Sequence, residues 1–367
     1  MMPEYNPENE VIKKRYEEGL LHGRQRDPKT VRAVWDAITL FEKSTGCADF
    51  WTFNADQAKA FKAQLEKQTN RAGAPLSLST LRSTLAAVRE FFQWLAMEKA
   101  YMGKIDAGAV AYLHLSKNAN RAARASRARP CPSLSDLERV LTAMPHATDM
   151  EQRDRAVVAF IAVTGVRDDA AVSLKRRHVD AGARTVWQDP KCVRTKGRKG
   201  IVTRFVSQAL PMAEGIVLDW LAHLDGPLGF GPNDPLFPKT RVEASAETLS
   251  FEARGLSREH WANAAPVREI FKQAFAAVGL PYANPHSLRN TLCKWGAKHL
   301  TQYEFKALSQ NLGHEHAMTT YNSYARLSED EQIEALAGVR PAGEHDLSGV
   351  PSWAMLEEMH RREKNRA

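Results

Sequence analysis

Residues 155–167 read RAVVAFIAVTGVR, and this stretch marks the centre of the larger half of the chain. Its apolar run from Ala156 to Val163 predicts a buried helix. Gly165 can end that helix because glycine adopts a positive φ without a steric penalty. Arg167 would then lie at the turn into the next helix, exposed above a rigid core.

The apolar run also argues against a membrane protein. Its eight residues are too few to cross a bilayer, which takes about 20. The first fourteen residues are polar and include Glu4, Glu8 and Glu10, so they do not form a secretory signal peptide. The four cysteines lie far apart without paired spacing, as in reduced intracellular proteins. We therefore expect a cytoplasmic protein with no membrane partner.

The positive charge of the chain is concentrated in two segments. Residues 107–135 hold five basic residues and no acid, and residues 181–211 hold seven basic residues and one acid. The net charge of the whole chain is only +8, so the remainder is slightly acidic. Basic charge gathered in this way is typical of a site for a polyanion. We therefore expect a nucleic acid partner and association with the nucleoid.

The length of 367 residues suggests two domains, at about 150 residues each. Helical periodicity dominates, and we expect a mainly α fold (class α+β) with a small antiparallel sheet. The predicted order is an N-terminal arm (1–26), a helical domain (27–115), a basic linker (116–132), a second, mostly helical domain (133–340) and a tail (341–367).

Several elements can be predicted more closely. In the first domain, helices are expected from Asp27-Pro28, over Ala55–Gln68 and from an N-cap at Ser79. The second domain is expected to begin with a capped helix near Ser135. The β-like runs at 185–187 and 201–206 flank a basic, glycine-containing tip and predict a hairpin or small sheet. Helices are expected again over 213–224, over 267–278 and from His286 onward.

Four short segments of the second half carry residues suited to chemistry. They are TGVR (164–167), TKG (195–197), HSLR (286–289) and LGH (312–314), and the last is followed ten residues later by Tyr324 in TTYNSYAR (319–326). In order, with PHSLRNT and NLGH as the longer forms, they resemble the motifs of the tyrosine recombinase (phage integrase) family. The resemblance covers about residues 134–330, and the helical first half is similar to that family's core-binding domain.

These residue types fit the cleavage of a phosphodiester. Charge builds on the non-bridging oxygens, and guanidinium groups such as Arg167 and Arg289 can pair with them through two donors. A phenol oxygen, here Tyr324, can attack phosphorus and form a covalent link. The resemblance further implies that His286 assists removal of the phenol proton, that Lys196 protonates the departing 5′ oxygen, and that His314 hydrogen-bonds the phosphate. Neither a metal nor another cofactor is expected.

Each assignment has a rival. Tyr321 could be the nucleophile instead of Tyr324, and Lys199 could replace Lys196. Cys293, His299, His314 and His316 could suggest zinc, but none of them forms a pair with a recognised ligand spacing. The family commonly has an acid three positions after the first arginine, where this chain has Ala170. Asp169 is the neighbouring acid that could substitute for it.

The resemblance also implies partners. The expected substrate is double-stranded DNA, bound by four protomers on two DNA sites. An accessory DNA-bending or directionality protein is a further possible partner. The tail contains an amphipathic segment around Trp353 and Leu356, which could dock on a neighbouring protomer or on its own domain. The residues expected to contact DNA are Arg82, Arg89, Lys117, Arg121, Arg124, Arg127, Arg194, Arg198 and Lys199.

We favour a recombinase of a mobile element over a chromosome-dimer resolvase, because the linker, arm and tail exceed the family's compact core. Two other classes remain open. One is a type IB topoisomerase-like enzyme that relaxes DNA with the same nucleophile chemistry. The other is a non-catalytic DNA-binding protein on the same scaffold.

Overall fold

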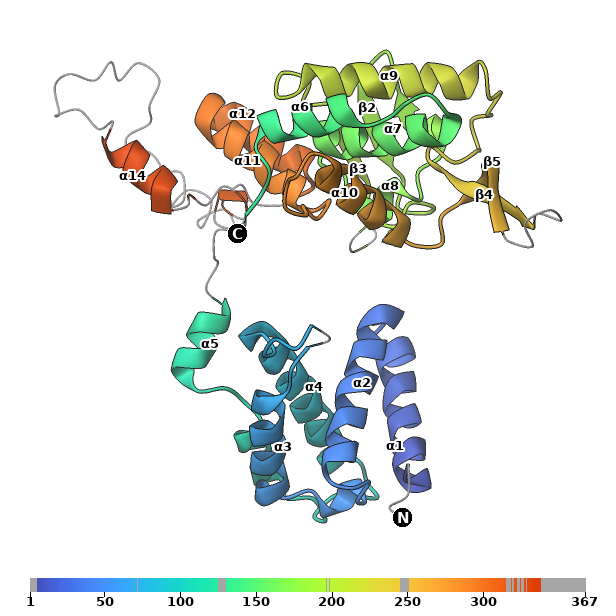
Figure 1. Ribbon diagram of the computed structural model, residues 1–367. Helices are drawn as coiled ribbons and strands as arrows, with labels where there is room; N and C mark the ends of the chain where they lie inside the picture. The colour runs from blue at the N-terminus through green and yellow to red at the C-terminus, as the bar shows by residue number, and fades with distance from the viewer. Residues whose placement is uncertain are drawn as a thin grey trace. The chain divides into compact units, whose positions relative to one another are not determined.

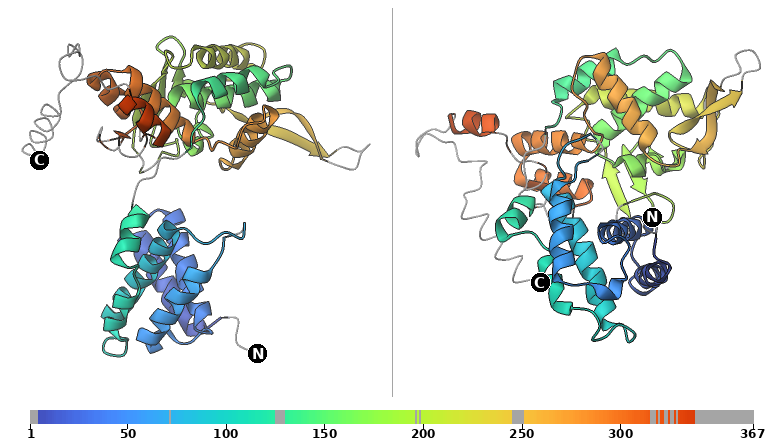
Figure 2. Two further views of the ribbon diagram at one scale, coloured as in Figure 1. Left: turned by 60° about the vertical axis from the view of Figure 1, so that its left-hand side comes forward. Right: turned by 60° about the horizontal axis from the view of Figure 1, so that its bottom comes forward.

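The computed structural model describes residues 5–70, 72–124, 130–195, 197, 199–244, 251–314, 318, 320, 321, 324, 327 and 329–337. The chain divides into two compact units, residues 1–125 and 126–367 (Figures 1 and 2). Helices predominate and the paired strands are antiparallel, so the predicted mainly α class with a small sheet is confirmed. None of the helices in the described ranges is long and apolar enough to span a bilayer.

The first unit is entirely helical in its described part. Its elements are α1 (Pro7–Glu18), the π-helix η1 (Gly19–Gly23), α2 (Pro28–Ser44), the 3₁₀ turn η2 (Phe50–Thr52), α3 (Ala55–Lys67), α4 (Leu78–Met97), the 3₁₀ segment η3 (Ala107–Tyr112) and α5 (Lys117–Arg124). Aromatic rings fill the core. Phe92 stacks on Phe53 with centroids 3.8 Å apart and meets Phe41 edge-on.

Polar caps set the helix starts in this unit. Asp27 accepts a hydrogen bond from the Lys29 N–H at the start of α2, as the sequence predicts. The predicted N-cap at Ser79 is wrong by two residues. Ser77 caps α4 instead, because its hydroxyl accepts from the Thr80 N–H.

The predicted arm over residues 1–26 needs correction, since α1 belongs to the first unit. Ile12, Tyr16 and Leu20 recur at helical spacing and are buried in its core. Lys13 is also buried, and its ammonium pairs with Glu42 at 2.7 Å. The many charges around these three apolar residues hid the stripe in the sequence.

The predicted linker is also shorter than 116–132. Residues 117–124 form α5, and Ala119 and Ala123 on one side of that helix contact the core of the first unit. The small residues that indicated a linker are here the contact face of a helix. Residues 125–129 lie outside the described part of the chain.

The second unit begins with α6 (Leu134–Ala143), α7 (Asp149–Thr164) and α8 (Asp168–Ala171). The 3₁₀ turn η4 (Arg176–His178) and the strands β1 (Val179–Asp180), β2 (Thr185–Gln188) and β3 (Ile201–Arg204) follow. The remaining elements are α9 (Pro211–Asp225), β4 (Pro238–Ala244), β5 (Phe251–His260), α10 (Ala265–Ala277), α11 (Ser287–His299), α12 (Gln302–Asn311) and α14 (Glu329–Ala337).

The buried helix predicted from residues 155–163 lies at the centre of this unit as α7. Its residues from Ala156 to Thr164 are all buried, and Gly165 ends it with φ 63°. The helix begins at Asp149, earlier than the apolar run, because Thr148 and Glu151 form a capping box. A second capping box, made by Ser133 and Asp136, starts α6 two residues before the predicted cap.

The predicted small sheet is present. Its three antiparallel strands have the order β1-β2-β3, and Val186 lies opposite Thr203. A further hairpin of β4 and β5 extends from the unit (Figure 2), and the sequence analysis missed it. Its strands carry exposed charged residues, so no apolar alternation indicated them.

Candidate active site

Arg289 on α11 is the centre of the candidate site. Only 2% of this residue is exposed. Its Nη1 donates to the Gly165 carbonyl at 2.6 Å, and its Nη2 donates to the Leu312 carbonyl at 2.5 Å. These carbonyls belong to the turns that follow α7 and α12, so one buried guanidinium holds both turns together. Within the described part, its Nε has no hydrogen-bond partner.

His314 lies just after the second of these turns, and its hydrogen bonds show which ring nitrogen carries the proton. Arg289 Nη2 can only donate, so His314 Nε2 accepts from it at 2.9 Å. The other ring nitrogen, Nδ1, therefore carries the proton and donates to Thr320 Oγ1 at 2.7 Å. Burial, with the charges of Arg289 and Arg167, lowers the pKa of His314 to about 4. The imidazole is therefore neutral at pH 7, and both ring nitrogens are already engaged.

Two further residues help to hold His314. Its ring accepts from Arg289 and donates to Thr320, which in turn bonds Ser309. The expected hydrogen bond from His314 to a phosphate stays a prediction. Thr320 and Ser309 share a hydrogen bond of 2.6 Å and are almost fully buried. The sequence analysis missed both residues. Thr320 lies four residues before Tyr324, a spacing that places both on one side of a helical turn.

Tyr324 lies between the two histidines. Its hydroxyl is 3.4 Å from His286 Nε2, and its ring stacks on His314 with centroids 4.7 Å apart. The guanidinium of Arg289 lies 5.7 Å from the centre of the same ring. Tyr321, the rival, is 45% exposed, and its ring contacts Phe305 instead. The structure therefore brings Tyr324, and not Tyr321, to the pair of His286 and Arg289.

Arg167 is the N-cap residue of α8 and is half-buried. Burial, together with the nearby charge of Arg167, lowers the pKa of Arg289 to about 10. Arg289 therefore remains protonated at neutral pH. Within the described ranges, no carboxylate forms an ion pair with either side chain. Two neighbouring cations without an acidic partner are suited to an anion with several oxygens.

The departure at position 170 is visible in the structure. Ala170 is 1% exposed and lies in the core of the second unit. Asp169 does not pair with Arg167 as its substitute, because it faces Arg194, whose Nε is 3.5 Å from its carboxylate.

Other predicted residues fall into three groups. Lys117 and Arg121 are exposed on α5, Lys199 is exposed in the loop between β2 and β3, and Arg82 and Arg89 are half-buried on α4. Arg194 is exposed, and its backbone N–H and guanidinium also bond within its own unit, so its expected DNA contact stays a prediction. Arg127, Lys196, Arg198 and the side chain of Arg124 lie outside the described residues.

One group of residues has the composition of a metal site. His178, Asp189 and Cys192 present ligand atoms within 4.8 Å of one another. His178 Nδ1 accepts from the Lys175 N–H, so the proton lies on Nε2, which faces the Cys192 sulfur at 3.5 Å. A metal bound at Nε2 would have to displace that proton. Hydrogen bonds that anchor the loop after β2 account for this group.

Comparisons with known proteins agree with this architecture. Residues 134–331 match the Phage integrase family, and residues 14–99 match the phage integrase N-terminal SAM-like domain. Tyrosine recombinase XerC of Oceanobacillus iheyensis is 23% identical over 328 residues, which are 87% of this chain and 92% of that protein.

Two solved structures share the fold. A lambda integrase dimer bound to a COC′ core site has a TM-score of 0.57 at 17% identity, with 87% of this chain and 97% of that chain covered. A lambda integrase tetramer bound to a Holliday junction has a TM-score of 0.56 at 17% identity, with 84% and 78% covered.

The family match gives the enzyme class, which is one that cuts and rejoins DNA. The chain belongs to the phage integrase family of tyrosine recombinases, because that family's model matches more than half of its length. The family predicted from the motifs is confirmed.

Proposed function

We propose that this protein is a site-specific recombinase that joins DNA covalently to Tyr324 through a 3′-phosphotyrosyl link. One observation carries the proposal. The Nε of Arg289 is a buried donor without a described partner, and it lies beside the tyrosine whose hydroxyl approaches His286. A buried N–H without an acceptor is costly, and a phosphate oxygen is the acceptor that this cationic site favours.

The Tyr324 oxygen attacks phosphorus while His286 Nε2 takes the phenol proton. Arg167 and Arg289 neutralise the charge on the non-bridging oxygens. The bond from phosphorus to the 5′ oxygen breaks, and Lys196 gives a proton to that oxygen. The 5′ hydroxyl of a second strand reverses the step, so neither ATP nor a metal is consumed or required.

DNA binding would involve both units. The exposed Lys117 and Arg121 on α5 and the half-buried Arg82 and Arg89 on α4 offer cations from the first unit. Each lysine or arginine placed near a phosphate releases counterions and strengthens binding. Exchange of four strands implies four protomers on two duplex sites, with the tail beyond residue 340 docking on a neighbouring protomer. An accessory DNA-bending or directionality protein fits the same scheme.

The direct test uses a nicked DNA substrate from which the cleaved 5′ fragment diffuses away. The wild-type protein should form a covalent protein–DNA band, and Tyr324→Phe should abolish the band while DNA binding is retained. Tyr321→Phe is the matched control and should retain the band. Loss of the band in Tyr321→Phe alone would give the nucleophile role to Tyr321.

Two further assays separate the rival classes. Strand exchange between paired sites distinguishes a recombinase from a type IB topoisomerase-like enzyme, which relaxes DNA without exchange. DNA binding without any covalent band would identify a non-catalytic scaffold. Activity in EDTA is expected, because the proposed chemistry uses no metal.

We further propose that the DNA exchanged belongs to a mobile element. The α5 extension and the long tail beyond the matched domain support this role over a compact chromosome resolvase. Footprinting on DNA that flanks the gene would test it. Protection at the ends of an element is expected, and protection only at a chromosomal resolution site would contradict it.

A further inference from the structure

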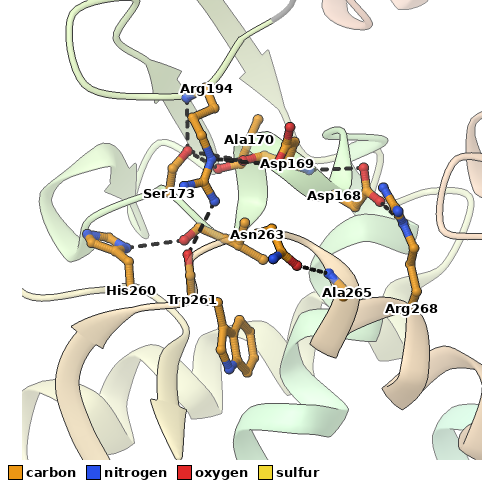
Figure 3. A network of polar contacts seen from close by, with 11 residues as sticks. Asp168, Asp169, Ala170, Ser173, Arg194, His260, Trp261, Asn263, Ala265 and Arg268 are labelled. Carbon is orange, nitrogen blue, oxygen red and sulfur yellow. Dashed lines mark hydrogen bonds and ion pairs between the residues drawn. The ribbon is translucent and has the colours of Figure 1, made fainter. Parts of the chain in front are cut away.

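α8, the element that follows Arg167, is too short to fix its own position. It has four residues, Asp168–Ala171, and Arg167 is its N-cap. The Arg167 side chain has no ion-pair partner among the described residues. Its placement therefore depends on what holds the backbone of this turn. Figure 3 shows that polar contacts reach the turn from two sides.

The first contact comes from α10. Arg268 Nε donates to Asp168 Oδ2 at 2.9 Å, and Asp168 Oδ1 accepts from the Asp169 N–H at 2.9 Å. The Asp168 side chain is 14% exposed and that of Arg268 is 53% exposed, so the carboxylate end of this ion pair is shielded from solvent. The residue next to Arg167 is thus tied to a long helix of the core (Figure 3).

The second contact comes from the loop between β2 and β3. The Arg194 N–H donates to Ser173 Oγ at 2.9 Å, just beyond α8. The guanidinium of Arg194 donates through Nη2 to the Trp261 carbonyl at 3.3 Å and lies 3.5 Å from the Asp169 carboxylate. Arg194 therefore links the loop, α8 and the segment after β5 (Figure 3).

We infer that Arg194 and Arg268 are positioning residues whose side chains hold the first turn of α8, next to Arg167, through Asp169 and Asp168. Ala170 cannot make such contacts, because it is buried in the core. Instead, the consecutive residues Asp168 and Asp169 bind the two arginines: Asp168 pairs with Arg268, and Asp169 pairs with Arg194. The inference rests on the proposed function in one respect, which is that Arg167 neutralises a phosphate.

This assignment differs from a DNA-contact role for Arg194. A phosphate contact would contribute mainly to affinity, and its removal would make the salt dependence of binding shallower by about one unit. A positioning residue would contribute mainly to the rate of cleavage, because a shift of about 1 Å in a catalytic group can lower the rate about a hundredfold.

The experiment compares Arg194→Met and Arg268→Met with Arg176→Met. Arg176 is the matched control, since it pairs with Asp225 at 2.7 Å elsewhere in the same unit. DNA affinity is measured over a range of salt concentrations. The single-turnover rate of covalent complex formation is measured on the nicked substrate with either a phosphate or a methylphosphonate at the cleavage position. Methylphosphonate lacks one charged oxygen, so its cleavage rate depends less on charge neutralisation by Arg167.

We expect Arg194→Met and Arg268→Met to slow cleavage of the phosphate substrate by roughly tenfold to a hundredfold. Affinity and its salt dependence should remain unchanged, and the loss should be smaller on methylphosphonate. Arg176→Met should match the wild type. Arg194→Lys and Arg268→Lys, which keep the charge, should restore part of the rate, and they replace the methionine variants if those do not fold.

Three results would overturn the inference. The first is cleavage at the wild-type rate in both variants. The second is an equal loss on the two substrates, which indicates general damage to the fold. The third is weaker binding by Arg194→Met with a shallower salt dependence, which would make Arg194 a phosphate contact. A wild-type protein that forms no covalent complex would instead count against the proposed function.

Discussion

The turn after α7 and the turn after α12 are built alike but differ in their surroundings. Each contains a glycine with positive φ, 63° at Gly165 and 73° at Gly313. Each also supplies a carbonyl to Arg289 and leads to a candidate site residue, Arg167 or His314. A Cβ atom at Gly165 would clash with Leu312 and lie 3.2 Å from Leu292, whereas the atoms nearest to a Cβ atom at Gly313 would belong to the side chain of Ile201.

This difference shows that buried core side chains fix the turn at Gly165. The turn at Gly313 is instead bounded by Ile201, whose side chain can move. Gly165 is buried between two leucines, and Leu312 itself belongs to the turn that offers its carbonyl to Arg289. The contact at Gly313 is the Cδ1 atom of Ile201, the flexible end of a half-buried side chain. Changes at the first turn should therefore damage both turns, and changes at the second should be tolerated better.

The largest effect is expected from Gly165→Ala. Alanine with positive φ costs about 1–2 kcal/mol, and overfilling the contact with Leu312 and Leu292 costs about 1–3 kcal/mol more. Urea unfolding should show this loss, and cleavage of the nicked substrate should fall with it. Gly229→Ala is the matched control for φ alone, since Gly229 has φ 59° with nothing within 4 Å of its Cβ position. Equal losses of unfolding free energy in Gly165→Ala and Gly229→Ala would show that the contact with Leu312 and Leu292 adds no cost.

A smaller effect is expected from Gly313→Ala. The backbone cost of about 1–2 kcal/mol remains, while Ile201 Cδ1, at 2.7 Å, can rotate away. Adding Ile201→Val removes that atom. The double variant should therefore lose less unfolding free energy to steric overlap, while the backbone cost remains. Unfolding free energies of the two single variants and the double variant measure the coupling. Strictly additive losses would show that Ile201 does not limit this turn.

A further effect concerns pH and appears only below about pH 6.5. The pKa of His314 is about 4 in the folded protein and near 6.5 in an unfolded chain. Between these values the unfolded state binds a proton that the folded state does not, so stability falls as the pH drops from 6.5 to 4. His314→Asn should reduce the slope of unfolding free energy against pH between pH 4 and 6.5. Above pH 7 it should leave that slope unchanged. An unchanged slope in urea unfolding at several pH values would contradict the lowered pKa of His314.

The sequence was most informative where local chemistry decides the structure. The end of α7 at Gly165 and the pairing of β2 with β3 follow from glycine geometry and β patterning, and both were predicted. The link from Arg289 to both turns could not be predicted, because its carbonyl acceptors lie 124 and 23 residues away. For the same reason the contacts of Arg194 with Asp169 and Trp261 could not be predicted, because these residues lie 25 and 67 positions away along the chain.

The most direct test of the central claim is to map the amino acid that carries the DNA. The covalent complex formed on the nicked substrate would be digested with nuclease and protease, and the nucleotide-bearing peptide would be sequenced by mass spectrometry. We predict a 3′-phosphate on Tyr324, the side chain stacked on His314 beside Arg289. A nucleotide on Tyr321, or on any residue outside this pocket, would contradict the account.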